Sequence, residues 1–256
     1  MRKSKAQHMP LFREYPGSKS LVVFIHGFMG SPRQFAGLVE VAYREGHSVA
    51  ALLLPGHGGS AKYFGTGSFE LWQGHVDSEI ERFSQDFSSV LLVGHSMGGW
   101  LAINAAVRFH SCVRGVFLLA TPFKRILFSF YALRLRFRQF FSRRDDPLRR
   151  EYFDNCSVAL TPNLILTSFR PSAELKRCMS VARGNLPLLS VPVFAVFSSA
   201  DELVSLKSVD ILRDELGDVP LELVLLSGST HVLYSPSDRA EVEREFFACI
   251  VSVFGA

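Results

Sequence analysis

Short and nearly continuous runs of apolar residues recur along the chain and alternate with longer amphipathic segments. The runs are rich in valine, leucine and phenylalanine, as is typical of strands buried on both faces of a parallel sheet. They predict strands at residues 20–27, 48–58, 90–96, 113–122, 191–201 and 221–231. The segments between them predict helices over about 31–45, from residue 68 onward, and over 98–109, 204–216 and 236–254. Such alternation indicates an α/β fold, with a mostly parallel sheet and helices on both faces.

Two of these helices carry start signals. Ser31 stands directly before Pro32, and proline is favoured at the first helical position. Ser68 is of a residue type that caps helices, and it precedes the helix between the second and third strands.

Residues 123–188 interrupt the alternation between the fourth and fifth strands. This interval is too long for a connecting loop, so it must have structure of its own. Apolar residues recur at helical spacing between Ile126 and Phe140, which predicts a helix there. We therefore expect an inserted helical cap, or lid, over the strand ends, with residues 1–122 and 189–256 forming the core. A polar–apolar alternation over 133–138 leaves a strand possible in the same place.

The positive charge of the chain is concentrated in one segment. The 256 residues carry a net charge of +4, but residues 124–150 alone hold nine Lys or Arg against two Asp, which makes that segment +7 and the rest −3. Because the basicity is local, we expect no nucleic-acid partner. The segment is interpreted either as a solvated face of the cap helix or as a basic amphipathic helix that contacts anionic membranes.

Composition bounds the location and the cofactor chemistry. No apolar run approaches the ~20 residues of a membrane-spanning helix, and no apolar stretch follows the basic residues at the start. The four cysteines are scattered and form no C-x-x-C pair, which argues against structural zinc. We expect free thiols and a cytoplasmic location. The oligomeric state is left open.

The stretch "VLLVGHSMGGW", residues 90–100, carries the first chemical signal. A buried strand ends in a serine with glycines two before it and two and three after it. This spacing indicates a turn so tight that a Cβ at the flanking positions would collide with neighbouring chain. Such a turn strains its serine and presents the hydroxyl outward, which makes Ser96 the candidate nucleophile. His95 is interpreted only as the variable position of this turn.

A serine hydroxyl needs a base to take its proton. Of the eight histidines only two follow Ser96, and His110 ends the helix that the serine begins. His231, in the loop after the last strand, is therefore the candidate base. Asp201 ends the preceding strand and is the candidate acid that orients the base, with its neighbour Glu202 as the alternative.

The negative charge that develops on a substrate carbonyl oxygen needs backbone N–H donors. Met97 directly follows the nucleophile and is one candidate. Phe28, in the loop "HGFMG" after the first strand, is the other. His26 and His57 lie in neighbouring loops and are interpreted as structural residues.

Five segments together resemble the serine α/β-hydrolase family: "FIHGFMGSPRQF", "LLLPGHGGS", "LLVGHSMGG", "SSADELVS" and "GSTHVL". The similarity is greatest to bacterial carboxylesterases and monoacylglycerol lipases. It covers about 20–122 and 190–254 but not the interval between them. It implies an α/β-hydrolase fold and hydrolysis of carboxylic esters through an acyl-enzyme, with no cofactor and no metal.

The residues leave several functions open. A serine nucleophile argues against dehalogenases and epoxide hydrolases, which resemble this fold but use an aspartate. Thioesterases, carbon–carbon hydrolases and perhydrolases remain alternatives on the same three residues. A ligand-binding protein without turnover is another, because fold alone does not decide function. The 23 phenylalanines favour a pocket for an apolar acyl chain.

Overall fold

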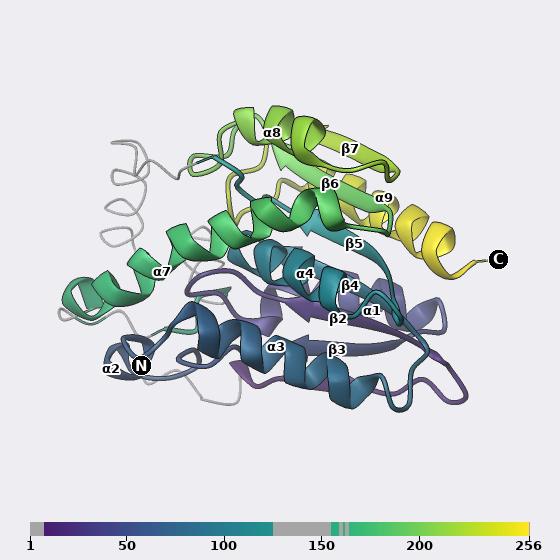
Figure 1. The fold of residues 1–256 in the computed structure, drawn as a ribbon, viewed down its shortest axis with the longest axis horizontal. Helices are drawn as coiled ribbons and strands as arrows, with labels where there is room; N and C mark the ends of the chain where they lie inside the picture. Colours follow the sequence, from purple (N-terminus) through teal and green to yellow (C-terminus); the bar gives the residue numbers. More distant parts are fainter. Residues whose placement is uncertain (1–7, 125–154, 159–160, 162–163, 256) are drawn as a thin grey trace.

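A computed structural model describes residues 8–124, 155–158, 161 and 164–255. In this part of the chain seven strands form one sheet, in the order β1-β3-β2-β4-β5-β6-β7 (Figure 1). Their bounds are β1 Leu11–Arg13, β2 Ser20–Ile25, β3 Ser48–Leu52, β4 Ser89–His95, β5 Val113–Leu119, β6 Val193–Ser198 and β7 Leu221–Leu226. Only β1 runs antiparallel to its neighbour, so the predicted mostly parallel sheet is confirmed.

Every strand expected from the apolar runs is present, but each ends earlier than predicted. The run at 48–58 forms a strand only as far as Leu52, and the run at 221–231 only as far as Leu226. The remaining residues of each run form loops beyond the carboxyl ends of the strands. In open parallel sheets these loops are where ligands bind.

The helices follow the predicted order. They are α1 Ala36–Arg44, α2 Ala61–Phe64, α3 Phe69–Phe83, α4 Met97–Arg108, α7 Leu164–Asn185, α8 Lys207–Glu215 and α9 Pro236–Phe254. A short 3₁₀ turn, Pro32–Phe35, precedes α1. The Ser68 side chain accepts the backbone N–H of Leu71, and Ser31 accepts that of Arg33, so both predicted start signals are confirmed. The one-turn α2 was not predicted.

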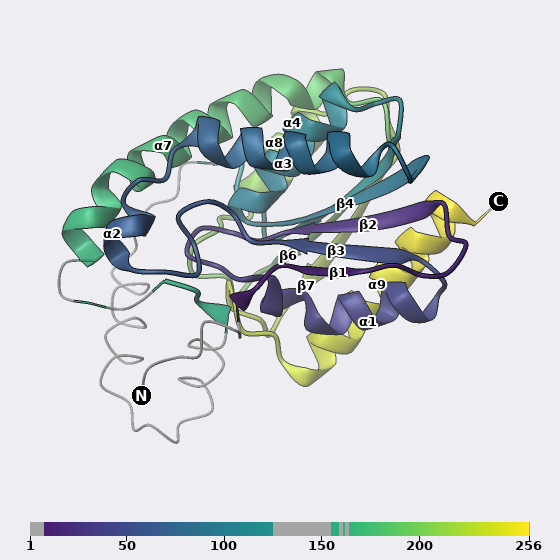
Figure 2. The ribbon, with the colours of Figure 1, turned by 90° about the horizontal axis from the view of Figure 1, so that it is seen from below.

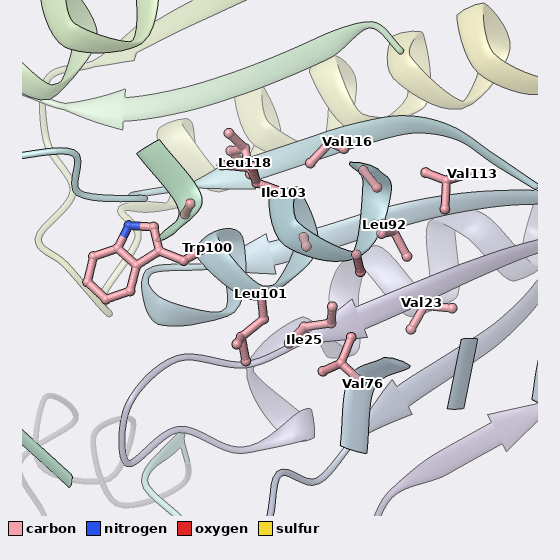
Figure 3. Packing of buried hydrophobic residues seen from close by; sticks show 14 of the residues in the cluster. Val23, Ile25, Val76, Leu92, Trp100, Leu101, Ile103, Val113, Val116 and Leu118 are labelled. Carbon is pink, nitrogen blue, oxygen red and sulfur yellow. The ribbon is translucent and has the colours of Figure 1, made fainter. Parts of the chain in front are cut away.

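Helices cover both faces of the sheet (Figure 2). α1 and α9 lie on one face, whereas α3, α4 and α7 lie on the other. α4 is buried over almost its whole length because the sheet lies beneath it and α3 and α7 flank it. Figure 3 shows Trp100, Leu101 and Ile103 of α4 among the aliphatic side chains of the sheet, which include Val23, Ile25, Leu92, Val116 and Leu118. This packing fixes the start of α4, where the candidate nucleophile lies.

α7 comes from the interval expected to form the cap. Cys178 and Ala182 in its second half are fully buried in the same core cluster as α3 and α4. The predicted helix from Ile126 to Phe140, the alternative strand at 133–138 and nearly all of the basic segment lie outside the described residues. The division into core and cap therefore stays a prediction. Within the described ranges, none of the helices combines the length and apolar character that crossing a membrane requires.

Candidate active site

The turn between β4 and α4 has the geometry that its glycines predicted. Ser96 has φ 53° and ψ −117°, a region that residues with a side chain rarely occupy. A Cβ on Gly98 would lie 2.0 Å from the carbonyl oxygen of Ile25, and one on Gly94 would lie 2.4 Å from the Cα of Gly99. Neither position has room for any other residue. The backbone N–H of Ser96 donates to the carbonyl of Leu119 at 2.8 Å, which ties the strained turn to β5.

The structure brings the three predicted site residues together. His231 Nε2 lies 3.0 Å from Ser96 Oγ, and His231 Nδ1 lies 2.9 Å from Asp201 Oδ2. All three side chains are buried. Because a carboxylate only accepts hydrogen bonds, the Nδ1–H of His231 donates to Asp201. The neutral ring then presents an unprotonated Nε2 to the hydroxyl of Ser96.

Asp201 is held as an anion. Its Oδ1 accepts the backbone N–H groups of Leu203 and Val204 at 2.8 and 2.9 Å, while its Oδ2 faces His231. Burial alone would raise the pKa of Asp201. The positive charge available on His231 and these hydrogen bonds outweigh burial, and they hold that pKa below its usual value.

Glu202 contacts the backbone of His231. Its Oε2 accepts the backbone N–H of His231 at 2.9 Å. Of the two acids that the sequence left open, Asp201 is therefore the one hydrogen-bonded to the ring. The adjacent carboxylates reach the same histidine at two different groups.

His95 has a contact that the sequence analysis missed. Its Nε2 lies 2.9 Å from the carbonyl oxygen of His231, and because that oxygen only accepts, the Nε2–H donates. Burial, and next the positive charge available on His231, lower the pKa of His95 to about 3, so its ring is neutral. The signal in the sequence was a polar side chain at the end of an otherwise apolar strand, since such a group needs a buried partner.

Two further histidines join the loop after β2 to the loop after β3. His57 Nε2 accepts the backbone N–H of Met29 at 3.1 Å, and His26 Nε2 accepts that of Leu54 at 3.1 Å. Burial lowers the pKa of His57 to about 4 and that of His26 well below its usual value. Both rings are therefore neutral, as an accepting nitrogen requires. These backbone contacts agree with their interpretation as structural residues.

The two predicted oxyanion donors come from the turn after β4 and from the loop after β2. Met97 is the first residue of α4, where backbone N–H groups have no acceptor inside the helix. Phe28 follows Gly27, and a Cβ on Gly27 would come within 3.1 Å of Ser96 Cβ, so this loop passes close to the nucleophile. In the described part of the chain the Phe28 N–H has no hydrogen-bond acceptor.

Apolar side chains gather beside this loop. The side chain of Phe28 packs against a small cluster that contains Met29, Ala61, Phe64, Cys156, Val158 and Leu164. The backbone N–H of Ser157 donates to the carbonyl of Met29 at 3.0 Å. Part of the interval between β5 and β6 thus contacts the loop that contains Phe28 directly. Among the described residues no group of three histidines, cysteines or carboxylates is placed to hold a metal ion.

Comparisons with known proteins agree with this fold. The sequence model of the alpha/beta hydrolase family matches residues 22–245. A thermostable monoacylglycerol lipase from Bacillus sp. (strain H-257) is 25% identical over 232 residues, which are 89% of this chain and 90% of that protein. The monoacylglycerol lipase of Paleococcus ferrophilus superposes with a TM-score of 0.71 at 19% identity, over 95% of this chain and 98% of that one. The monoglyceride lipase of Saccharomyces cerevisiae gives 0.72 at 14% identity, over 95% and 91%.

Proposed function

The chain belongs to the alpha/beta hydrolase family, and from that premise we propose that it is a serine carboxylic-ester hydrolase. Its substrates are esters with an apolar acyl chain, as in carboxylesterases and monoacylglycerol lipases. The observation that carries the proposal is the unbroken hydrogen-bonded series from Ser96 Oγ through both ring nitrogens of His231 to Asp201. No cofactor and no metal ion enters the reaction.

In the proposed reaction each residue has one step. Ser96 Oγ attacks the ester carbonyl while His231 Nε2 takes the hydroxyl proton. The anionic Asp201 stabilises the imidazolium that forms. The backbone N–H groups of Phe28 and Met97 bind the oxygen that becomes negative. The imidazolium then protonates the leaving alcohol, and the acyl group stays on Ser96 until water, activated by the same histidine, releases it as the acid.

The apolar cluster beside Phe28 supports the acyl preference. Each methylene that such a surface buries contributes about 0.8 kcal/mol to binding. The Bacillus, Paleococcus and Saccharomyces relatives are named as lipases of monoacylglycerol or monoglyceride, and this agrees with an acyl chain bound at an apolar wall.

The triad is tested by single substitutions. Ser96→Ala and His231→Ala should each lower kcat on p-nitrophenyl esters by about 10⁴-fold or more, because the groups act as a unit. Asp201→Asn should lower kcat by a factor of similar order. His110 is exposed and is the other histidine after the nucleophile, so His110→Ala is the matched control and should keep wild-type activity. A fully active Ser96→Ala would refute the proposal.

A chain-length series separates the alternative functions. The measurement compares p-nitrophenyl esters of increasing length with monoacylglycerols, thioesters and a fluorophosphonate probe. Labelling at Ser96 with preference for longer acyl esters supports the proposal. Labelling with faster thioester turnover identifies a thioesterase, and turnover of neither class leaves a carbon–carbon hydrolase or a perhydrolase. The absence of both labelling and turnover indicates a ligand-binding protein that uses this fold.

The cytoplasmic location and the membrane contact of residues 124–150 are carried forward as predictions. If the segment contacts membranes, it should bind anionic vesicles and release them as salt rises, since each cation near such a surface contributes about 1 kcal/mol. Sedimentation with anionic and neutral vesicles measures this. Equal binding to both kinds, or to neither, leaves the arginines as a solvated face.

A further inference from the structure

The backbone of His231 is held from both sides by side chains that belong to other parts of the chain. Glu202 Oε2 accepts its N–H at 2.9 Å, and His95 Nε2 donates to its carbonyl oxygen, also at 2.9 Å. His95 is the last residue of β4, and Glu202 lies in the loop that follows β6. The two contacts thus hold the N–H and the carbonyl on either side of the same Cα. We call His95 and Glu202 the His231 clamp.

The ring of His231 must meet two partners at once. Catalysis needs Nε2 near Ser96 Oγ and Nδ1 near Asp201 Oδ2 at the same time, at the observed 3.0 and 2.9 Å. His231 lies in a loop between β7 and α9, outside any strand or helix. A backbone that shifts there carries the ring away from both partners, and a displacement of about 1 Å in a catalytic group costs about 100-fold in rate.

Other contacts hold the loop farther from the ring. Asp238 Oδ2 accepts the N–H of Gly228 and the hydroxyl of Ser229, and Ser198 Oγ donates to the carbonyl of Ser229. These bonds secure the base of the loop two and three residues before His231. The clamp bonds the backbone N–H and the carbonyl oxygen of His231 directly, so its loss should alter the ring position more than the stability of the loop.

The bonding of the two ring nitrogens of His95 indicates that its role is to bond His231. Its Nδ1 is buried and has no hydrogen-bond partner in the described part of the chain. A leucine or phenylalanine in its place would fill the space without stranding a buried nitrogen, which costs free energy. His95 donates a hydrogen bond to the carbonyl of His231, which an apolar residue could not do. Its Nε2 is bonded to His231 and its Nδ1 has no hydrogen-bond partner among the described residues, so His95 is not placed as a second base for Ser96.

We propose that His95 and Glu202 are positioning residues, which hold the His231 peptide so that its ring meets Ser96 and Asp201 together. The inference rests on the proposed function, because it assigns the two residues to that same catalytic histidine. Neither residue touches the substrate. Both act through His231, so they should govern kcat and leave KM nearly unchanged.

Glu202 is tested by a pair of substitutions that separate hydrogen bonding from charge. Glu202→Gln keeps an oxygen that accepts the His231 N–H, and it should keep most of the wild-type kcat. Glu202→Leu removes the acceptor and should lower kcat by up to about 100-fold. A loss in both variants would mean that the charge matters and not the clamp. Full activity in both would remove Glu202 from the proposal.

His95 is tested by a second pair. The amide nitrogen of glutamine can take the place of Nε2, so His95→Gln should retain much of the activity, whereas His95→Leu has similar bulk and no donor. We expect His95→Leu to lower kcat by up to about 100-fold at nearly constant KM. His110→Leu is the matched control at an exposed histidine. Equal kcat in His95→Leu and wild type would overturn the role of His95, and a fall in His95→Gln as large as in His95→Leu would do the same.

A spectroscopic readout works without turnover and separates the two proposals. The Nδ1 proton of His231, shared with Asp201, should give a downfield ¹H resonance that disappears in His231→Gln. It should persist in Glu202→Gln and His95→Gln and broaden or shift in the two leucine variants, at unchanged melting temperature.

If wild type neither hydrolyses esters nor reacts with a fluorophosphonate, the proposed function fails while this resonance still tests the clamp. If wild type is active and the leucine variants leave both rate and resonance unchanged, the clamp alone fails. A leucine variant that unfolds is replaced by the alanine variant, and equal spectra there overturn the clamp.

Discussion

Among the described residues, three that carry side chains have a positive φ, and one of them is the candidate nucleophile. They are Met29 in the oxyanion loop, Ser96 itself and Ala120 just after β5. Each such conformation costs on the order of 1–3 kcal/mol and persists only where neighbours enforce it. Here backbone hydrogen bonds do so: Ser96 donates to Leu119, and Ala120 donates to the carbonyl of Val196. The strain thus includes the candidate nucleophile and the residue that follows Phe28 in its loop.

Two glycines on helices make a matched test of the tight turn. Gly98→Ala should destabilise the fold by about 1–3 kcal/mol, because its Cβ would lie 2.0 Å from the carbonyl oxygen of Ile25. Gly74 in α3 has nothing within 4 Å of the same position, so Gly74→Ala should stabilise by about 0.4–1 kcal/mol. Urea denaturation of both variants measures the difference. A Gly98→Ala protein as stable as wild type would show that the turn has more room than its geometry indicates.

At this scale the sequence predicted which residue types meet but not which atoms. The order of Ser96, Asp201 and His231 along the chain was enough to select them, because each follows a strand of one sheet. It did not separate Asp201 from Glu202, since adjacent residues in a loop have no fixed facing direction. Nor did it find the contact of His95, which depends on where a loop 136 positions away returns to the sheet.

At the scale of elements, strands were predicted well at their centres and poorly at their ends. The apolar run after Ser48 continues through Leu53 and Leu54, and sequence alone does not show that pairing with β2 stops at Leu52. β1, at Leu11–Arg13, was missed because three largely exposed residues at a sheet edge give no periodic signal. Helix starts were predicted better, because the side chains of Ser31 and Ser68 accept backbone N–H groups a few residues away, which is a local interaction.

α7 joins the rest of the molecule through a buried series of amides. Asn185, at the end of α7, donates to Asn104 Oδ1 at 2.8 Å, and Asn104 donates to Gln73 Oε1 at 3.0 Å. Asn104 lies on α4 and Gln73 on α3, so one polar chain crosses three helices. Asn104 is fully buried. Polar networks of this kind stabilise a fold only while every member is paired.

Removing the middle amide should therefore loosen α7. Asn104→Leu leaves the Gln73 oxygen and the Asn185 amide without their partner, which should cost about 1–3 kcal/mol of unfolding free energy. Arg177→Gln is the control on the same helix. It breaks an ion pair with Glu70 in which both side chains are more than half exposed, so it should change stability little. Thermal denaturation compares the two, and equal melting temperatures would show that the amide series does not hold α7.

At the scale of the whole molecule, three buried histidines should make stability depend on pH. His26, His57 and His95 are neutral in the folded protein, mainly because burial lowers their pKa, to about 4 for His57 and about 3 for His95. In the unfolded chain an imidazole takes up a proton near pH ~6.5. Between these values the unfolded state binds more protons than the folded state. The free energy of unfolding must then fall as pH falls, by up to about 1.4 kcal/mol per pH unit for each histidine.

Urea denaturation between pH 4.5 and 8, followed by the fluorescence of the buried Trp72 and Trp100, tests this linkage. Asp201 does not contribute in this range, because its lowered pKa means that its stabilisation is lost only below about pH 4. We expect a plateau above pH 7 and a steady decline below about 6.5 in wild type. His57→Gln keeps an acceptor for Met29 but has no titrating group, so its decline should be shallower even if its plateau is lower. His110→Gln, at an exposed position, should keep the wild-type slope. If His57→Gln declines as steeply as wild type, His57 is not held neutral in the fold, and the hydrogen bond that it accepts from the oxyanion loop would not exist in solution.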